Sequence, residues 1–247
     1  MSALSGFETI DAVAVAIFFA AWFIHTLVVS HLPLKRRTLS HQMHTYSSLW
    51  MDNAVRRETK MADVLIQNSL QQGVLFFAST SILVVGGLLA GLGAADQAVR
   101  VLSDLPFTST DTQLEWEVKV LLVAGIIAYA FFKFVWSYRL LNYVIILIGA
   151  APDRMTEKPR HDANELDAWS SKLGQLHSVA TYHFTSGIHA YFHALSAIAW
   201  FISPWLFIAA TLWVSLVLYR RAFASRFLQI LADRDDGKGV PGPRTGG

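Results

Sequence analysis

Four long apolar stretches, separated by polar segments, dominate the chain. They cover approximately residues 10–30, 69–95, 118–149 and 188–219. A helix of about 20 apolar residues crosses the roughly 30 Å hydrocarbon core of a bilayer, so each stretch is long enough to span a membrane. The pattern therefore predicts an all-α, polytopic bundle of transmembrane helices.

The third stretch is too long for one perpendicular crossing, and it contains Lys133 and Arg139. Aromatic residues around Tyr138 are typical of a membrane interface. We expect the span to end there. The helix would then continue along the membrane surface or tilt strongly.

The fourth stretch contains Ser203 and Pro204. Proline removes a backbone donor and disfavours helix just before it. The stretch is therefore either one long kinked helix or two short helices that form a hairpin at Ser203–Pro204.

Charge between the stretches favours the hairpin. Segments 33–68 and 150–187 and the residues after 220 each carry several lysines and arginines, whereas segment 96–117 carries only Arg100 among five acidic residues. The positive-inside rule then places the N-terminus outside and the C-terminus in the cytoplasm. This orientation requires five crossings, and four crossings are the alternative. The expected spans are residues 10–30, 69–95, 118–138, 188–203 and 204–220.

Composition agrees with a membrane protein. The chain is 53% hydrophobic and only 15% charged, against about 25% charged residues in soluble domains.

Its net charge of +2 gives no indication of a nucleic-acid partner, and the absence of cysteine excludes disulfides and thiolate sites. The N-terminus lacks the basic region of a cleaved signal peptide, so we expect the first span to be retained. We expect one membrane domain over residues 1–232 and a disordered tail over 233–247.

The sequence resembles the bacterial branch of the family called domain of unknown function 599 (DUF 599). The resemblance rests on "YSSLWMDNAVRRETKMADVLIQNSLQQGVLFFASTSILVVGG", "FFKFVWSYRLLNYVIILIGAAP", "HFTSGIHAYFHALSAIAWFISPW" and "WVSLVLYRRAF". It covers roughly residues 32–223. It implies a multi-pass protein of the bacterial cytoplasmic (inner) membrane, and no catalytic residue can be carried over because none is established.

One motif departs from the family pattern. Similar members read "HFNxGLRAYFF", whereas this chain has Thr185 and His189 at the Asn and Arg positions and also gains His193. His189 and His193 share one helix face at a spacing that can bind a metal, and His25 could approach them. The favoured interpretation is two interface histidines with ordinary hydrogen bonds, so no cofactor is predicted. Haem or metal at this pair is the weaker alternative.

Polar residues within the apolar stretches are the candidates for a solute pathway or pocket. Ser79 and Thr80 lie in the second span, and Lys133 and Arg139 lie in or beside the third. Charges inside spans are costly and tend to mark function, although lysine and arginine can also extend to the interface. Serine and threonine can instead bond to the carbonyl four residues back.

The segment between the first two spans is expected to be helical, basic and cytoplasmic. Its candidates for contact with lipid or with a partner are Trp50, Arg56, Arg57 and Asp63. Further along the second span, Gly86, Gly87 and Gly91 provide small residues that allow close helix packing. The acids at the start of the third span, in "TDTQLE", predict a solvated helix start with an N-cap.

Three functions are compatible with these features. The favoured one is non-enzymatic conduction or transport of a small solute or ion by a homo-oligomer, supported by polar residues in the spans and the possible broken helix. The alternative is an accessory or scaffold subunit bound to another membrane protein. A metal-dependent enzyme ranks third, since no catalytic motif is present.

Overall fold

The computed structural model describes residues 9–31, 39–93, 112–152 and 163–223, and within these ranges all regular structure is helical. The expected all-α bundle is confirmed. The elements are α1 (Thr9–His31), α2 (Leu39–Arg56), α3 (Met61–Leu92), α5 (Gln113–Ala150), α6 (Ala163–Ile198), the 3₁₀ turn η2 (Ala199–Phe201) and α7 (Pro204–Phe223).

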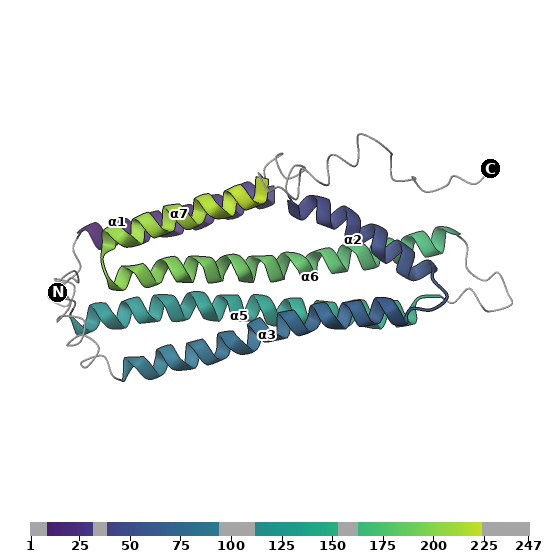
Figure 1. Cartoon of the computed structure of the whole chain (residues 1–247), viewed down its shortest axis with the longest axis horizontal. Helices are drawn as coiled ribbons and strands as arrows, with labels where there is room; N and C mark the ends of the chain where they lie inside the picture. The colour runs from purple at the N-terminus through teal and green to yellow at the C-terminus, as the bar shows by residue number, and fades with distance from the viewer. Residues whose placement is uncertain (1–8, 32–38, 94–111, 153–162, 224–247) are drawn as a thin grey trace.

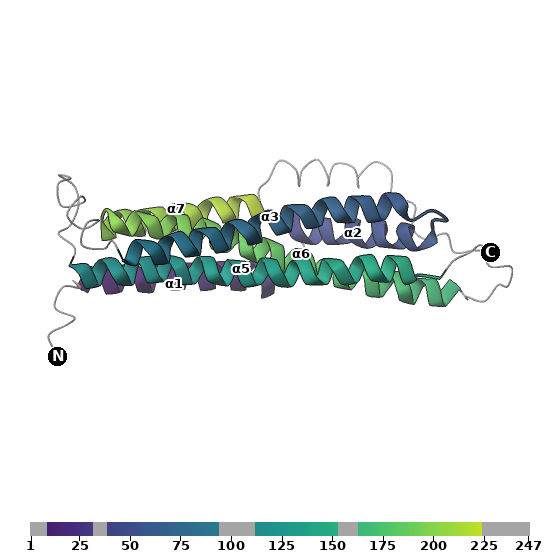
Figure 2. The ribbon, with the colours of Figure 1, turned by 90° about the horizontal axis from the view of Figure 1, so that it is seen from below.

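The bundle has two halves that share three long helices. Helices α3, α5 and α6 run along its whole length, with α5 in contact with both of the others (Figures 1 and 2). Helices α1 and α7 pack together beside one half of α6, and α2 packs on the other half. These are called the α1/α7 half and the α2 half below.

Helix lengths distinguish the two halves. Helices α1, α3, α5 and α7 are long and apolar enough to cross a membrane. At about 1.5 Å per residue, the 23 residues of α1 and the 20 of α7 measure about 35 and 30 Å, close to the roughly 30 Å of hydrocarbon. The 32 residues of α3 and the 38 of α5 measure about 48 and 57 Å. Their excess length lies in the α2 half.

The predicted hairpin at Ser203–Pro204 is confirmed. Helix α6 ends at Ile198, η2 turns the chain, and Pro204 is the first residue of α7. Proline suits this position because the first helical N–H needs no intrahelical partner. The Ser203 hydroxyl accepts a hydrogen bond from the Trp205 backbone N–H at 3.3 Å.

The C-terminal end of α5 packs against protein. As expected, the helix continues past Tyr138, and it reaches Ala150 beside α6. Val144 and Ile148 are buried there against residues of α2 and α6, including Met51 and Leu173. Protein neighbours therefore cover the apolar residues that the sequence alone would assign to lipid.

The start of α5 agrees with its expected N-cap. Thr112 accepts the backbone N–H of Glu115, whose side chain in turn accepts the Thr112 N–H at 2.8 Å. Thr112, Gln113 and Leu114 are exposed, as expected of a solvated helix start, whereas the Glu115 side chain itself is only 7% exposed.

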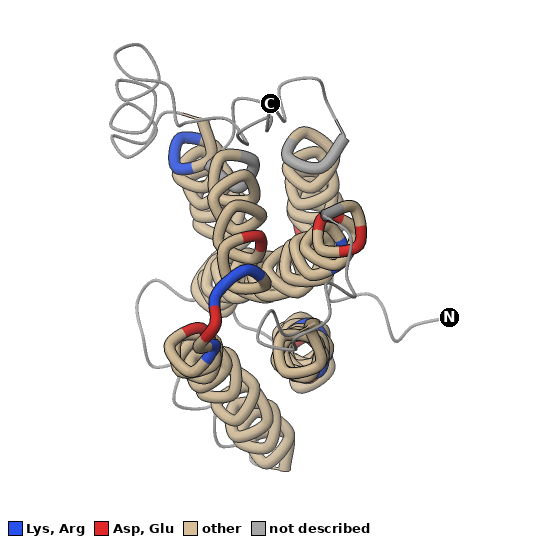
Figure 3. The backbone as a smooth tube through the Cα atoms, turned by 90° about the vertical axis from the view of Figure 1, so that its right-hand side faces the viewer, with Lys and Arg blue, Asp and Glu red and all other residues tan. Residues whose placement is uncertain are grey.

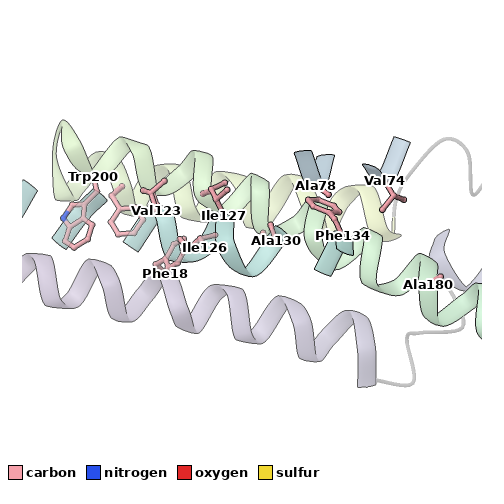
Figure 4. Close-up of a cluster of buried hydrophobic side chains, with 14 of the residues drawn as sticks. Phe18, Val74, Ala78, Val123, Ile126, Ile127, Ala130, Phe134, Ala180 and Trp200 are labelled. Atoms are coloured by element: carbon pink, nitrogen blue, oxygen red, sulfur yellow. The ribbon is translucent and has the colours of Figure 1, made fainter. Parts of the chain in front are cut away.

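The core of the α1/α7 half is apolar and aromatic. Figure 4 shows buried side chains along the helices from Trp200 near the hairpin, through Ile127, to Phe134 and Ala180. A separate apolar cluster lies in the α2 half around Met51 and Val144.

Candidate functional site

Three polar side chains lie on the buried face of α3 in the α2 half. Asp63 and Gln67 are fully buried and Gln71 is 7% exposed. Their four-residue spacing places them one above the other on one side of the helix. They are called the polar face below. The next buried residues of α3 are Val74, Ala78 and Ser81.

Asp63 begins the polar face and is held from the α2 side. Its Oδ1 atom accepts a hydrogen bond from the Trp50 indole at 2.7 Å and another from the Arg57 guanidinium at 2.6 Å. Arg57 is about half exposed, so the ion pair reaches from the interior to the surface. Viewed from this end, Figure 3 shows acidic and basic residues close together, whereas most of the helical backbone carries neither.

Gln67 has no hydrogen-bond partner for either amide atom among the described residues. The same holds for Asp63 Oδ2 and Gln71 Nε2. An unpaired buried polar group costs about 1–3 kcal/mol, and buried groups are normally bonded to protein or to ordered water. The polar face therefore has the donors and acceptors to hold water or a small polar solute.

His177 of α6 borders this site through Trp50. It is 5% exposed, and its ring meets the Trp50 ring edge-on at 5.5 Å between centroids. Burial lowers the pKa of His177 to about 4, with a smaller contribution from His44. The ring is therefore neutral at pH 7 and offers one donor and one acceptor. Neither ring nitrogen has a partner in the part of the chain described.

An aromatic cluster marks the end of this polar region toward the α1/α7 half. The Phe77 ring stacks on Phe134 at 5.5 Å, and Phe184 and Tyr191 pack against both. The Tyr191 hydroxyl lies 2.9 Å from the Ser81 hydroxyl. The cluster needs Gly187, because a Cβ there would lie 2.5 Å from Phe134 Cε1.

The four pathway candidates face different neighbours. Ser79 is exposed, and Thr80 donates to the Phe76 carbonyl at 2.9 Å, as its helix position allows. Lys133 lies over the Tyr129 and Tyr182 rings. Arg139 donates to the Tyr143 hydroxyl at 2.7 Å and lies over Trp136. These residues do not converge on one site.

The α2-side candidates do meet. Trp50 and Arg57 both bond to Asp63, so Arg57 is its cationic partner. Arg56 pairs with Asp52 on its own helix and with Asp167 of α6, which ties α2 to α6.

The glycines Gly86, Gly87 and Gly91 face outward. A Cβ at any of them would meet no described atom within 4 Å beyond the helix's own backbone. They are therefore not used for close packing between the described helices of this chain.

The histidines of α6 gather with His25 of α1. The His25 ring lies 4.8 Å from His189 and 6.3 Å from His193 between centroids, and His193 stacks on Trp22. In the described ranges, however, no group of three or more His, Cys, Asp or Glu residues is arranged to hold a metal ion.

Sequence reasoning missed Gln67, Gln71, His177 and Lys119. The spacing of the two glutamines from Asp63 was a visible signal.

Lys119 is only 2% exposed and lies over the Trp200 ring at 5.6 Å, while Trp200 donates to Asp11 of α1 at 2.7 Å. These two contacts hold α1, α5 and the hairpin turn together, so the role of Lys119 is structural.

Comparison with known proteins finds one family. The sequence profile described as "Protein of unknown function, DUF599" matches residues 13–227, which is most of the chain. No curated protein and no solved structure matches the chain.

Proposed function

We propose that this chain, which belongs to the DUF599 family, is a non-enzymatic membrane protein that conducts or transports a small solute or ion as a homo-oligomer. The solute first binds at the polar face of α3. The observation that carries this proposal is the full burial of Gln67 with neither amide atom bonded within the described chain. Buried polar groups are normally bonded to protein or to ordered water, so an amide with no partner in the described chain supports a polar occupant at this position.

The proposed orientation places the α2 half in the cytoplasm of a bacterium and the α1/α7 half in its inner membrane. The excess length of α3 and α5 and the basic residues near the α2–α3 turn support this placement. Helix α6 lies beside α5 and α7 and makes the fifth crossing. The chain has no cysteine, so single cysteines at residues 2 and 240 can be tested with an impermeant thiol reagent in intact cells. Labelling of the first alone is expected, and labelling of the second alone contradicts the orientation.

Two features support a homo-oligomer. The rings of Phe77, Phe134, Phe184 and Tyr191 close the inside of the single bundle beyond the polar face. A route therefore needs either movement of these rings or a passage between copies. The outward glycine face of α3 offers a surface on which a second copy can approach closely.

The test is solute flux in proteoliposomes of the full chain. Osmotic swelling is measured with glycerol and acetamide, and ion flux with K⁺ and Cl⁻. We expect flux above protein-free liposomes that Gln67→Leu lowers about tenfold, because the change removes the unbonded amide. Gln72→Leu makes the same substitution at the exposed neighbour and should leave flux unchanged. Protein that carries none of the four solutes contradicts the proposal.

The glycine face also favours a second candidate, an accessory subunit of another membrane protein. A different membrane protein, rather than a second copy, would then occupy Gly87 and Gly91. Gentle extraction followed by native mass measurement separates the two. A stoichiometric foreign subunit that is lost in Gly87→Leu favours the accessory function, and a homo-oligomer lost in the same variant favours transport.

A further inference from the structure

The polar face also indicates which class of solute it binds, an inference that rests on the proposed function because it concerns the same site. Among the described residues, the unbonded atoms there include the acceptors Asp63 Oδ2 and Gln67 Oε1 and the donors Gln67 Nε2 and Gln71 Nε2. A bare cation would leave both amide donors unpaired, and a simple anion would leave both acceptors unpaired. A solute that carries donors and acceptors can pair with atoms of both kinds.

Charge gives a second, independent argument. The one carboxylate of the polar face, Asp63, is already paired with Arg57 at 2.6 Å, so the pair has no net charge. Lys60 adds a positive charge at the same end of α3, where its ammonium bonds to the Ala151 carbonyl at 2.7 Å. A cation would meet Arg57 and Lys60 on its way in. A cation that lost its water at Gln67 would also lack a free counter-charge, which is strongly unfavourable.

We propose that the polar face binds a small, neutral solute with both hydrogen-bond donors and acceptors, such as an amide or a polyol, and that Arg57 sets this preference. Gln67 provides the central contact because its amide offers both kinds of group from a fully buried position. Arg57 does not touch the solute. It is a positioning residue that cancels the charge of Asp63 and so removes the attraction for cations.

Binding can be measured on the full chain in detergent without any flux. Trp50 bonds directly to Asp63, so its indole fluorescence should respond to an occupant. The chain has 8 Trp residues, and subtraction of a Trp50→Phe titration isolates this signal. The probes are acetamide, glycerol and KCl. We expect a saturable response to acetamide or glycerol and none to KCl.

Three variants test the roles of the residues. Gln67→Leu should weaken binding of the neutral probe about tenfold, which corresponds to about 1.4 kcal/mol, whereas the exposed Gln72→Leu should not change it. Arg57→Gln should create a saturable response to KCl, because the Asp63 carboxylate then lacks its counter-charge. Near-ultraviolet circular dichroism checks that each variant is folded.

Several outcomes overturn the inference. For the wild type, these are a saturable response to KCl or the lack of a saturable response to either neutral probe. For the variants, they are unchanged binding of the neutral probe by Gln67→Leu or no saturable response of Arg57→Gln to KCl. The two proposals fail separately. Neutral-probe binding without any flux refutes transport and keeps this inference, while flux of K⁺ or Cl⁻ alone refutes this inference and keeps transport.

Discussion

The two parts of α3 follow different rules for the polar groups that they bury. In the α2 half, the buried residues Asp63, Gln67 and Gln71 present side-chain atoms that have no partner in the described chain. In the α1/α7 half, the buried residues are Val74, Ala78 and Ser81, and Ser81 donates to the Phe77 carbonyl at 2.7 Å.

This difference shows how one helix serves two surroundings. A hydroxyl at membrane depth can satisfy itself on its own helix, which suits a medium without water. Long amide side chains have no such local solution when they point into a bundle, and such groups are normally bonded to protein or to ordered water. The change occurs next to the aromatic cluster of Phe77 and Phe134, where α3 passes from one half to the other.

The largest expected effect is the loss of stability at low pH caused by His177 in the α2 half. Because the pKa of His177 is about 4 in the folded chain and 6.5 in an unfolded one, the unfolded chain binds the proton first as pH falls. The stabilising effect of the neutral ring is complete above about pH 6.5 and is lost as pH falls to about 4, for a total of about 3 kcal/mol. Thermal unfolding in detergent at several pH values measures it. A His177→Leu chain should lack this part of the pH dependence, and an unchanged profile contradicts the prediction.

The next effect concerns the aromatic cluster. Gly187→Ala places a methyl group against the buried Phe134 ring and should lower the free energy of unfolding by about 1–3 kcal/mol. Gly125→Ala on α5 is the control, because a Cβ there meets no described atom within 4 Å. It should be neutral or slightly stabilising. Equal melting temperatures for the two variants would show that Phe134 gives way without cost.

A smaller loss of stability is expected from a substitution of Asp63, at the start of the polar face. Asp63→Asn removes the charge that the Trp50 and Arg57 donors share and should cost about 1–2 kcal/mol, moderated because Arg57 can be solvated. Asp52→Asn removes the partly exposed partner of Arg56 and should cost less than about 1 kcal/mol. Chemical unfolding followed by circular dichroism compares them. A larger loss for Asp52→Asn would contradict the assignment of Asp63 as the buried anchor of α2.

The smallest expected effect is a gain, rather than a loss, in the free energy of unfolding. Without solute, Gln67→Leu replaces an unbonded buried amide by an apolar group and should leave stability unchanged or raise it by up to about 1 kcal/mol. The exposed Gln72→Leu should change it little. A clear loss of melting temperature in Gln67→Leu alone would show that Gln67 is satisfied in the solute-free protein.

Much of the fold could be predicted because apolar length and proline chemistry act locally. The long apolar stretches gave the helices, and Pro204 with the charge of the flanking segments indicated the hairpin. The neighbours that cover the C-terminal part of α5 could not be predicted in the same way. Val144 and Ile148 are equally apolar whether lipid or α2 covers them, and only tertiary packing decides.

The candidate site was predictable in part. Trp50, Arg57 and Asp63 were chosen for their charge and position, and they do meet. Lys133 was chosen because a charge in an apolar stretch is unusual, yet the Tyr129 and Tyr182 rings accommodate it. The burial of His177 depends on an aromatic ring from another helix, so no local pattern marks it.

The α6–η2–α7 hairpin has a consequence for how the protein is made. Helix α6 is not among the described helices apolar enough to cross a membrane, while α7, joined to it by a short turn, is. A translocation channel that tests segments one at a time would not release α6 into lipid by itself. We therefore expect the two helices to insert together, late in synthesis and against a preformed α5. A single cysteine introduced in α6 should react with a water-soluble thiol reagent in nascent chains truncated before Pro204, whereas chains that include α7 should protect it.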